Sequence, residues 1–241
     1  MPRKRQPKPE AVQPKKVLVI TAHPDDSEFG AAGTVALWSS QGWEVNYVVC
    51  TNGDKGSQDP KMTPKKLAKI REKEQRCAAD VLGVKEVVFL GYGDGELEES
   101  RDFLRNVVRL IRRFRPDIVV TQDPYRRNAA HRDHRITGRV VLDAIFPYAR
   151  DRLHFYELLR DEGLEPHKVR EVYLTGAEDP DTFIDISPTW ERKIAAIKCH
   201  HSQVGGRDEH FPQFMRQNAE TLGKEKGIPL AEAFRRLEMR V

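Results

Sequence analysis

The sequence predicts an α/β fold: a Rossmann-like, mostly parallel twisted sheet flanked by helices, in a single domain. Strand-like and helix-like segments alternate through residues 16–150, which is typical of a parallel sheet with helical connections. Residues 16–21 form an apolar, β-branched run of strand length, as expected for a buried strand. The 241 residues are enough for one such domain with a sizeable core.

The first half of the chain supplies three strands and two clear helices. Strands are expected at residues 16–21, 44–50 and 86–90. A helix at 30–41 ends before Gly42, because glycine is common just past a helix C-terminus. Residues 64–82 carry apolar side chains at helical spacing, so they predict a long amphipathic helix.

Strands and helices continue to alternate in the second half. Helices are expected at 100–114 and 132–147, and strands at 117–121, 170–175 and 182–186. Ser187 caps a helix that runs toward residue 200, with Pro188 in its first turn. The tail from residue 210 onward is expected to be helical.

The segment 23–28, with the sequence HPDDSE, follows the first strand. Ligands of open α/β sheets gather at the carboxyl ends of the strands, so these side chains can face a cleft. Asp25 and Asp26 are neighbours in an extended segment and point to opposite sides, so one can bind a metal beside His23. Alternatively, both aspartates cap the next helix. The segment replaces a G-x-G-x-x-G turn, which disfavours a nicotinamide dehydrogenase.

A second cluster of histidine and aspartate occurs at residues 131–134, with the sequence HRDH. It follows the strand expected at 117–121 and opens the next helix. Two such clusters, each after a strand, are hard to explain as independent helix caps. Capping without chemistry stays open as the alternative for His131 and Asp133.

Together, the segments 23–28 and 131–134 resemble the LmbE-like (PIG-L) family of zinc-dependent N-acetylglucosaminyl deacetylases. Weaker matches occur in the family's order at 51–54, 71–74, 90–95 and 200–203. The resemblance covers residues 16–203. The two His/Asp motifs are specific in combination, whereas the other segments support the resemblance mainly by their order.

The resemblance implies a single zinc ion per chain, with three ligands and room for water. The implied ligands are His23, Asp26 and His134. Asp25 is implied as the general base that takes a proton from the attacking water. His131 would stabilise the oxyanion or protonate the departing amine, and Asp133 would hold the His131 ring and keep it charged. Whether Asp25 or His131 protonates the amine stays open.

The resemblance also implies three substrate-binding residues, each with a simpler alternative. Arg71 would turn toward substrate, or it would pair with Glu74 one helical turn away. Asp94 would bind a sugar hydroxyl, or it would only shape a turn. His200 would contact substrate, or it would pack against the site.

The implied activity is removal of the N-acetyl group from an N-acetylglucosamine-type conjugate, a small-molecule partner, with release of acetate. The alternatives are another metal-dependent amidase or esterase, or a non-enzymatic sugar-binding module. A binding module would be expected to have a broken motif, yet every motif residue is present. The sugar conjugate, the metal loaded in the cell and the oligomeric state stay undetermined, and a homo-oligomer stays open.

The positive charge is concentrated at the N-terminus. The net charge is +4, but residues 1–16 hold six basic residues and one acidic residue, so the remainder is slightly negative. Residues 1–15 are therefore expected to be a basic disordered tail, and residues 16–241 the deacetylase domain. No nucleic-acid-binding motif accompanies the tail, so no nucleic-acid partner is expected.

The sequence predicts a cytoplasmic protein without a membrane partner. No apolar run approaches the roughly 20 residues of a transmembrane helix, and no secretory signal is recognisable. The three cysteines, Cys50, Cys77 and Cys199, are odd in number and far apart. They are expected to be reduced residues of the core.

Overall fold

The computed structural model describes residues 15–127, 131–205 and 211–239. Its centre is a seven-stranded sheet with the order β3-β2-β1-β4-β5-β7-β6. The strands are β1 (Lys16–Thr21), β2 (Glu44–Thr51), β3 (Glu86–Tyr92), β4 (Ile118–Gln122), β5 (Glu171–Thr175), β6 (Thr182–Asp185) and β7 (Ala231–Glu238). The first five strands are parallel, and β7 pairs antiparallel with β5 and β6. The expected mostly parallel α/β sheet is confirmed.

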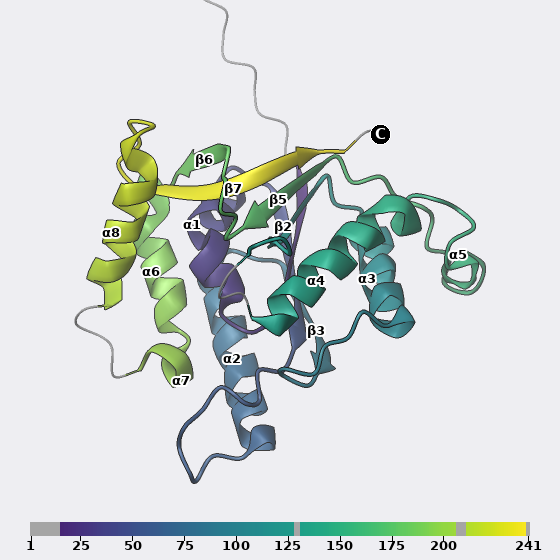
Figure 1. Ribbon diagram of the computed structural model, residues 1–241, viewed down its shortest axis with the longest axis horizontal. Coiled ribbons are helices and arrows are strands. Elements are labelled where there is room, and N and C mark those ends of the chain that lie inside the picture. The colour runs from purple at the N-terminus through teal and green to yellow at the C-terminus, as the bar shows by residue number, and fades with distance from the viewer. Residues whose placement is uncertain (1–14, 128–130, 206–210, 240–241) are drawn as a thin grey trace, which may run out of the picture.

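Helices cover both faces of this sheet (Figure 1). One layer holds α1 (Asp26–Ser40), α2 (Pro64–Leu82), α6 (Trp190–Lys198), α7 (His201–Val204) and α8 (Phe211–Lys224). The other layer holds α3 (Arg101–Phe114), α4 (Arg132–Asp143) and α5 (Tyr156–Glu162). A π-helical segment (Ala144–Ala149) continues α4, and a 3-10 turn (Ser187–Thr189) leads into α6.

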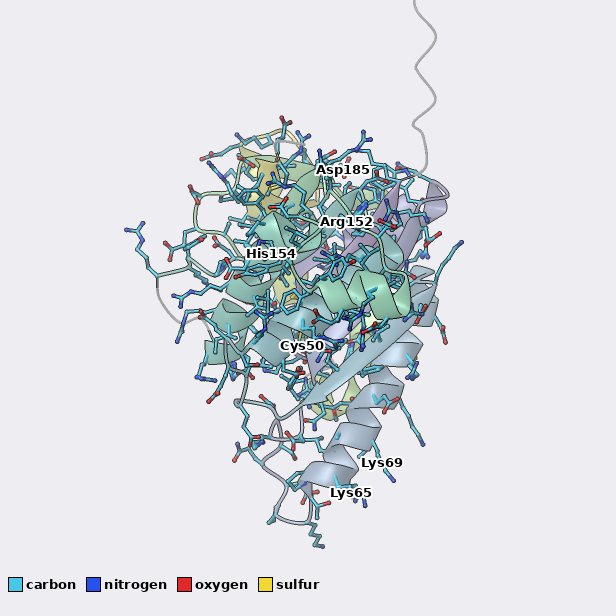
Figure 2. All side chains as sticks on the ribbon, turned by 90° about the vertical axis from the view of Figure 1, so that its right-hand side faces the viewer. Cys50, Lys65, Lys69, Arg152, His154 and Asp185 are labelled. Carbon is cyan, nitrogen blue, oxygen red and sulfur yellow. A yellow bond between two sulfur atoms is a disulfide. The ribbon has the colours of Figure 1, made fainter. Side chains whose placement is uncertain are left out.

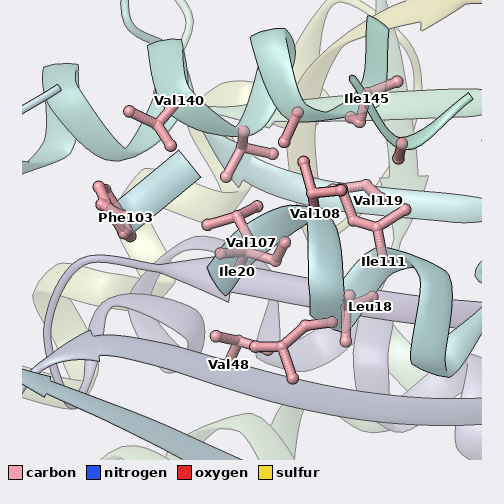
Figure 3. Packing of buried hydrophobic residues seen from close by; sticks show 14 of the residues in the cluster. Leu18, Ile20, Val48, Phe103, Val107, Val108, Ile111, Val119, Val140 and Ile145 are labelled. Carbon is pink, nitrogen blue, oxygen red and sulfur yellow. The ribbon is translucent and has the colours of Figure 1, made fainter. Parts of the chain in front are cut away.

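The central strand β1 is buried on both faces, which explains its continuous apolar sequence. Leu18 and Ile20 face the core under α3 and α4, where they join Val107 of α3 (Figure 3). Val17 and Val19 face the other way, into the core under α1 and α2. Successive side chains of a strand point to opposite faces, so one strand supplies both cores.

The C-terminal strand β7 was not expected. The residues of β7 include several good helix formers, and the tail was expected to be helical throughout, as it is in α8. Pairing with β5 on one side and β6 on the other determines the strand. Tertiary pairing of this kind overrides the local propensity of a segment.

The cysteines differ from their expected state. Cys77 of α2 and Cys199, the residue after α6, form a disulfide with Cα atoms 5.9 Å apart. The expectation of reduced core residues is therefore wrong for this pair, whereas Cys50 is free and buried (Figure 2). The two partners are 122 residues apart in sequence, and only the packing of α2 against α6 brings them together.

Among the described residues, none of the helices has the length and apolar character needed to cross a bilayer. Charged side chains such as Lys65 and Lys69 project outward from α2 (Figure 2).

Candidate active site

The two His/Asp motifs meet at the carboxyl ends of β1 and β4, which are neighbours in the sheet. His23 lies in the turn after β1, and Asp26 is the first residue of α1. His134 lies in the first turn of α4, which follows β4. Residues more than 100 positions apart are thus brought to one edge of the sheet, where α/β enzymes bind ligands.

Three possible metal-binding side chains converge in this place, with one ligand atom from each within 4.8 Å of the others. His23 Nδ1 lies 3.2 Å from Asp26 Oδ2 and 3.2 Å from His134 Nε2, and His134 Nε2 lies 3.0 Å from Asp26 Oδ1. Tetrahedral zinc with ligands at about 2.0–2.2 Å would hold them roughly 3.3 Å apart. The spacing and the two-nitrogen, one-carboxylate set therefore fit a zinc ion.

A second grouping, His23 with His131 and Asp133, also brings potential ligand atoms close together. It is the weaker candidate, because Asp133 Oδ2 already accepts the backbone N–H of Gly95 at 2.6 Å in a fully buried position. His131 Nδ1 in turn accepts the backbone N–H of Asp133 at 3.1 Å. The ligand set of the first grouping is the one that fits.

The far side of the His23 ring faces two more carboxylates. His23 Nε2 lies 3.1 Å from Asp94 Oδ1 and 3.2 Å from Asp133 Oδ2. Burial alone would lower the pKa of His23, but hydrogen bonds with Asp133, Asp26 and Asp94 raise it to about 11. Such carboxylate contacts orient a metal-binding imidazole, and the surplus of negative charge suits a divalent cation.

Asp133 and His131 do not make the contact expected of them. The carboxylate of Asp133 meets His23 rather than the His131 ring, because its place in the first turn of α4 turns it into the interior. Burial and the nearby charge of His23 lower the pKa of His131, opposite to the expected direction. His131 is exposed at the helix N-cap, with its ring edge-on to that of His23.

Asp26 is held firmly on the metal side of the site. Its Oδ2 accepts the backbone N–H of His23 at 2.7 Å and the side-chain amide of Gln122 at 2.8 Å. Burial would raise the pKa of Asp26, but hydrogen bonds with His134 and His23 lower it strongly. Gln122 was missed in the sequence, although its place at the end of β4 is a signal for this edge of the sheet.

Asp25 is neither extended nor a side-chain cap. It lies at the N-cap of α1 with φ 96° and ψ −27°, and its side chain makes no capping hydrogen bond. This left-handed backbone is costly for a residue other than glycine, by roughly 1–3 kcal/mol, and such outliers cluster at functional sites. Asp25 Oδ2 lies 3.2 Å from Arg71 Nη2. The side chains of Asp25 and Asp26 thus point apart because of the left-handed backbone at Asp25. The alternation of side chains along an extended strand is not the cause.

The surroundings of Asp25 shift its pKa toward neutral pH. Burial first, and then the charge of Asp26, raise its pKa to about 7, against the opposing effect of Arg71. A catalytic base is most effective when its pKa lies close to the working pH. The neighbouring aspartates therefore have pKa values shifted in opposite directions.

The three expected substrate-binding residues are all buried. Arg71 is buried and donates to Gly53 O at 3.0 Å, so the alternative of a surface pair with Glu74 is wrong. Glu74 instead accepts hydrogen bonds from Ser202. Asp94 is turned toward His23, as described above. His200 is fully buried, which corresponds to the packing alternative.

A cavity of about 400 Å³ adjoins the converged donor atoms. Asp26 and His134 form one end of it, and α8, β7 and the segment after β5 form the remaining walls. Its apolar lining includes Phe29, Met215 and Leu222. Pockets of this size and character are typical of small-molecule sites.

Comparisons with known proteins agree with the site geometry. The family model described as PIG-L, GlcNAc-PI de-N-acetylase, matches residues 18–145. Diacetylchitobiose deacetylase of Thermococcus kodakarensis is 34% identical over 222 residues, which cover 92% of this chain and 82% of the relative. The structure of N,N'-diacetylchitobiose deacetylase from Pyrococcus horikoshii has a TM-score of 0.88 and 34% identity, covering 93% of this chain and 84% of the other.

A relative with a different activity is also found. The 4-oxalmesaconate hydratase of Pseudomonas putida is 29% identical over 201 residues, which cover 78% of this chain and 74% of the relative. The fold and family are therefore shared by deacetylases and a hydratase. The family match and the 34% identity over nearly the whole chain show that this protein belongs to the PIG-L, or LmbE-like, family.

Proposed function

We propose that this protein is a zinc-dependent hydrolase that removes the acetyl group from an N-acetylglucosamine-type conjugate and releases acetate. The observation that carries the proposal is the convergence of His23, Asp26 and His134, with Asp25 next to Asp26 in the chain. The deacetylase relatives, similar over almost the full chain, support the same reaction.

His23, Asp26 and His134 would hold a zinc ion, which would supply the Lewis acidity that polarises an amide carbonyl and makes water nucleophilic near neutral pH. Asp25 takes the proton of the attacking water. His131, whose Nδ1 accepts a backbone N–H, has Nε2 left to donate toward the substrate oxygen or the departing amine. The amine receives its proton from Asp25 or from His131, and both routes stay open.

The cavity beside Asp26 and His134 is the proposed place of the sugar conjugate. Arg71 and Asp94 stay proposed as residues that approach the sugar, since their side chains lie against Asp25 and His23. His200 is not proposed as a substrate contact, because it is fully buried against Glu28.

The direct experiment measures acetate release from several N-acetylglucosaminides, together with the metal content of the purified protein. We expect one zinc per chain, release of acetate, loss of activity with a chelator and recovery on adding Zn²⁺. The panel includes simple esters, other amides and an unsaturated dicarboxylic acid. Absence of acetate release alongside hydration of the unsaturated acid, or cleavage of the esters alone, would refute the proposal.

The cytoplasmic location and the absence of nucleic-acid or membrane partners also stay predictions. The Cys77–Cys199 disulfide disagrees with a reducing cytoplasm, since cytosolic disulfides are rare outside hyperthermophiles. Thiol titration shows whether the disulfide is present in the native cells. The protein is purified from these cells under acid-quenched conditions. Three free thiols support the cytoplasm, and one indicates an oxidising environment or a hyperthermophile.

A further inference from the structure

A chain of buried polar side chains lies behind the active site. Glu28 of α1, Gln75 of α2 and His200 are each fully buried. Gln75 Nε2 donates to both carboxylate oxygens of Glu28, at 3.0 and 3.1 Å. His200 Nε2 lies 3.0 Å from Glu28 Oε2. Since burying such groups is costly, a chain of this kind is expected to have a purpose beyond packing.

This chain of buried side chains ends at the backbone N–H of Asp25. Gln75 Oε1 accepts the N–H of Asp25 at 2.9 Å. Arg71 lies one turn earlier on the same face of α2, and its guanidinium donates to the carboxylate of Asp25 and to the carbonyl of Pro24. One face of α2 therefore holds both the backbone and the side chain of Asp25, which has a left-handed backbone conformation.

Glu28 determines which way the Gln75 amide faces. A carboxylate accepts hydrogen bonds and does not donate them, so the NH₂ group of Gln75 must point to Glu28. The carbonyl oxygen of Gln75 is then left for the N–H of Asp25. For the same reason, Nε2 of His200 carries the hydrogen that Glu28 accepts. The order of hydrogen-bond donors and acceptors is thus fixed from His200, through Glu28 and Gln75, to Asp25.

A disulfide links the two segments that carry Gln75 and His200, two members of this chain. Cys77 lies two residues after Gln75, and Cys199 directly precedes His200. Their disulfide joins α2 to the end of α6, next to both members of the chain. The relative position of Gln75 and His200 is therefore fixed independently of the hydrogen bonds.

We propose that Gln75, oriented by Glu28 and His200, is a positioning residue that holds Asp25 in the backbone conformation required of the general base. The inference rests on the proposed deacetylase function for its effect on turnover. Its effect on the Asp25 backbone does not depend on that function.

The first variant is Gln75→Leu, which keeps a similar volume and removes all three hydrogen bonds of the amide. We expect kcat to fall roughly 10- to 100-fold, as for a displaced catalytic group, while KM and the zinc content stay as in wild type. The amide of Asp25, followed by hydrogen exchange in NMR spectra, should exchange faster than in wild type.

Exchanging the amide and the carboxylate between Gln75 and Glu28 gives a second test in case Gln75→Leu does not fold. Gln75→Glu alone places a second carboxylate beside Glu28, whereas Gln75→Glu with Glu28→Gln restores every donor, every acceptor and the net charge. The double variant should recover most of the lost kcat and the slow exchange at Asp25. Gln217→Glu, at an exposed position of α8, is the matched control and should behave as wild type.

Three results would overturn the positioning role. They are wild-type kcat in Gln75→Leu, a loss of kcat that follows the loss of zinc, or a folded double variant without recovery. Failure of wild type to release acetate would overturn the proposed function instead. In that case, unchanged exchange at Asp25 in the Gln75 variants would still refute the inference, and faster exchange would support it.

Discussion

The two ring nitrogens of His23 have different partners, and the site depends on both. Nδ1 faces Asp26 and His134, whereas Nε2 faces Asp94 and Asp133. A carboxylate on the far nitrogen fixes the ring orientation and makes the near nitrogen a better ligand. Asp133, fully buried, is the more buried of these two carboxylates.

Asp133→Asn tests this arrangement. The asparagine keeps an oxygen for Gly95 N–H but removes the charge from the His23 ring, so zinc affinity should fall roughly 10- to 100-fold. Competition with a chromophoric chelator measures the affinity. Asp161→Asn, at an exposed position, is the control. Wild-type zinc affinity in Asp133→Asn would show that the contact has no effect on the metal.

The sequence predicted which residues gather at the site better than it predicted their contacts. The two His/Asp motifs each follow a strand, so their meeting at one sheet edge could be anticipated. The partners of Arg71 and Asp133 could not, because they depend on how α2 and α4 rotate against the sheet. The left-handed backbone of Asp25 could not be anticipated either, because the sequence has no glycine at this position to indicate it.

At the level of elements, the cross-link between α2 and α6 is the feature with the largest expected effect on stability. A disulfide that closes a long loop typically contributes about 2–4 kcal/mol by restricting the unfolded chain. In a chain of this size, each kcal/mol corresponds to roughly 2–4 °C in Tm. The partners here are 122 residues apart.

Reduction of the protein should therefore lower Tm by several degrees. Cys77→Ser should lower it similarly and make it insensitive to dithiothreitol. Differential scanning calorimetry with and without the reductant measures both. The cross-link would be refuted by an identical wild-type Tm in the two conditions, together with three titratable thiols in the unfolded, unreduced protein.

His167 connects the segment before β5 to the end of α3 and should give stability a pH dependence. Its Nε2 lies 2.7 Å from the carbonyl of Pro116, and burial lowers its pKa below the usual value. The unfolded chain then binds more protons than the folded chain as pH falls through about 6.5, so stability is lost on acidification.

His167→Gln keeps a donor for Pro116 but cannot titrate. The variant should lose less stability than wild type between about pH 7.5 and 5.5, around the usual histidine pKa. Urea unfolding at several pH values measures the difference. Equal pH dependence in the two proteins would show that His167 is not protonated on unfolding in this range.

The sequence also predicted the elements unevenly. The bounds of β1 and α2 agree with the expectation, because an apolar run and a periodic stripe are local signals. The strand β7 was missed because the residues Ala231–Glu238 become a strand only through pairing with β5 and β6. Local sequence patterns predict a helix or strand whose buried residues recur at regular spacing. They fail where pairing with strands distant in sequence determines the conformation of a segment.

At the scale of the whole molecule, most of the excess positive charge lies before the first strand. Lys15, expected in the tail, already takes part in the fold through an ion pair with Glu171 at 2.8 Å. The boundary of the folded domain therefore includes Lys15.

Deletion of residues 1–14 should leave Tm and turnover nearly unchanged, since the described contacts of the sheet start at Lys15. The isoelectric point should fall, because the deletion removes four basic residues and one acidic residue. Calorimetry and acetate release measure the first two quantities. A marked loss of either would show that the N-terminal residues dock on the fold.

In the proposed mechanism, the adjacent aspartates Asp25 and Asp26 have different tasks, and paired variants test this division. Asparagine tolerates a left-handed backbone, so Asp25→Asn should leave the local conformation intact. We expect Asp25→Asn to keep zinc and KM while kcat falls about 100- to 10,000-fold, which is about 2.7–5.4 kcal/mol of barrier. Asp26→Asn should lose zinc, because a neutral amide replaces a charged ligand.

The decisive measurement is zinc content and acetate release in both variants, side by side. We expect a zinc-loaded, nearly inactive Asp25→Asn and a zinc-depleted Asp26→Asn. An empty site in Asp25→Asn with a full one in Asp26→Asn would exchange the two roles. A zinc-loaded Asp25→Asn with wild-type turnover would contradict the mechanism, because the general base would then lie elsewhere.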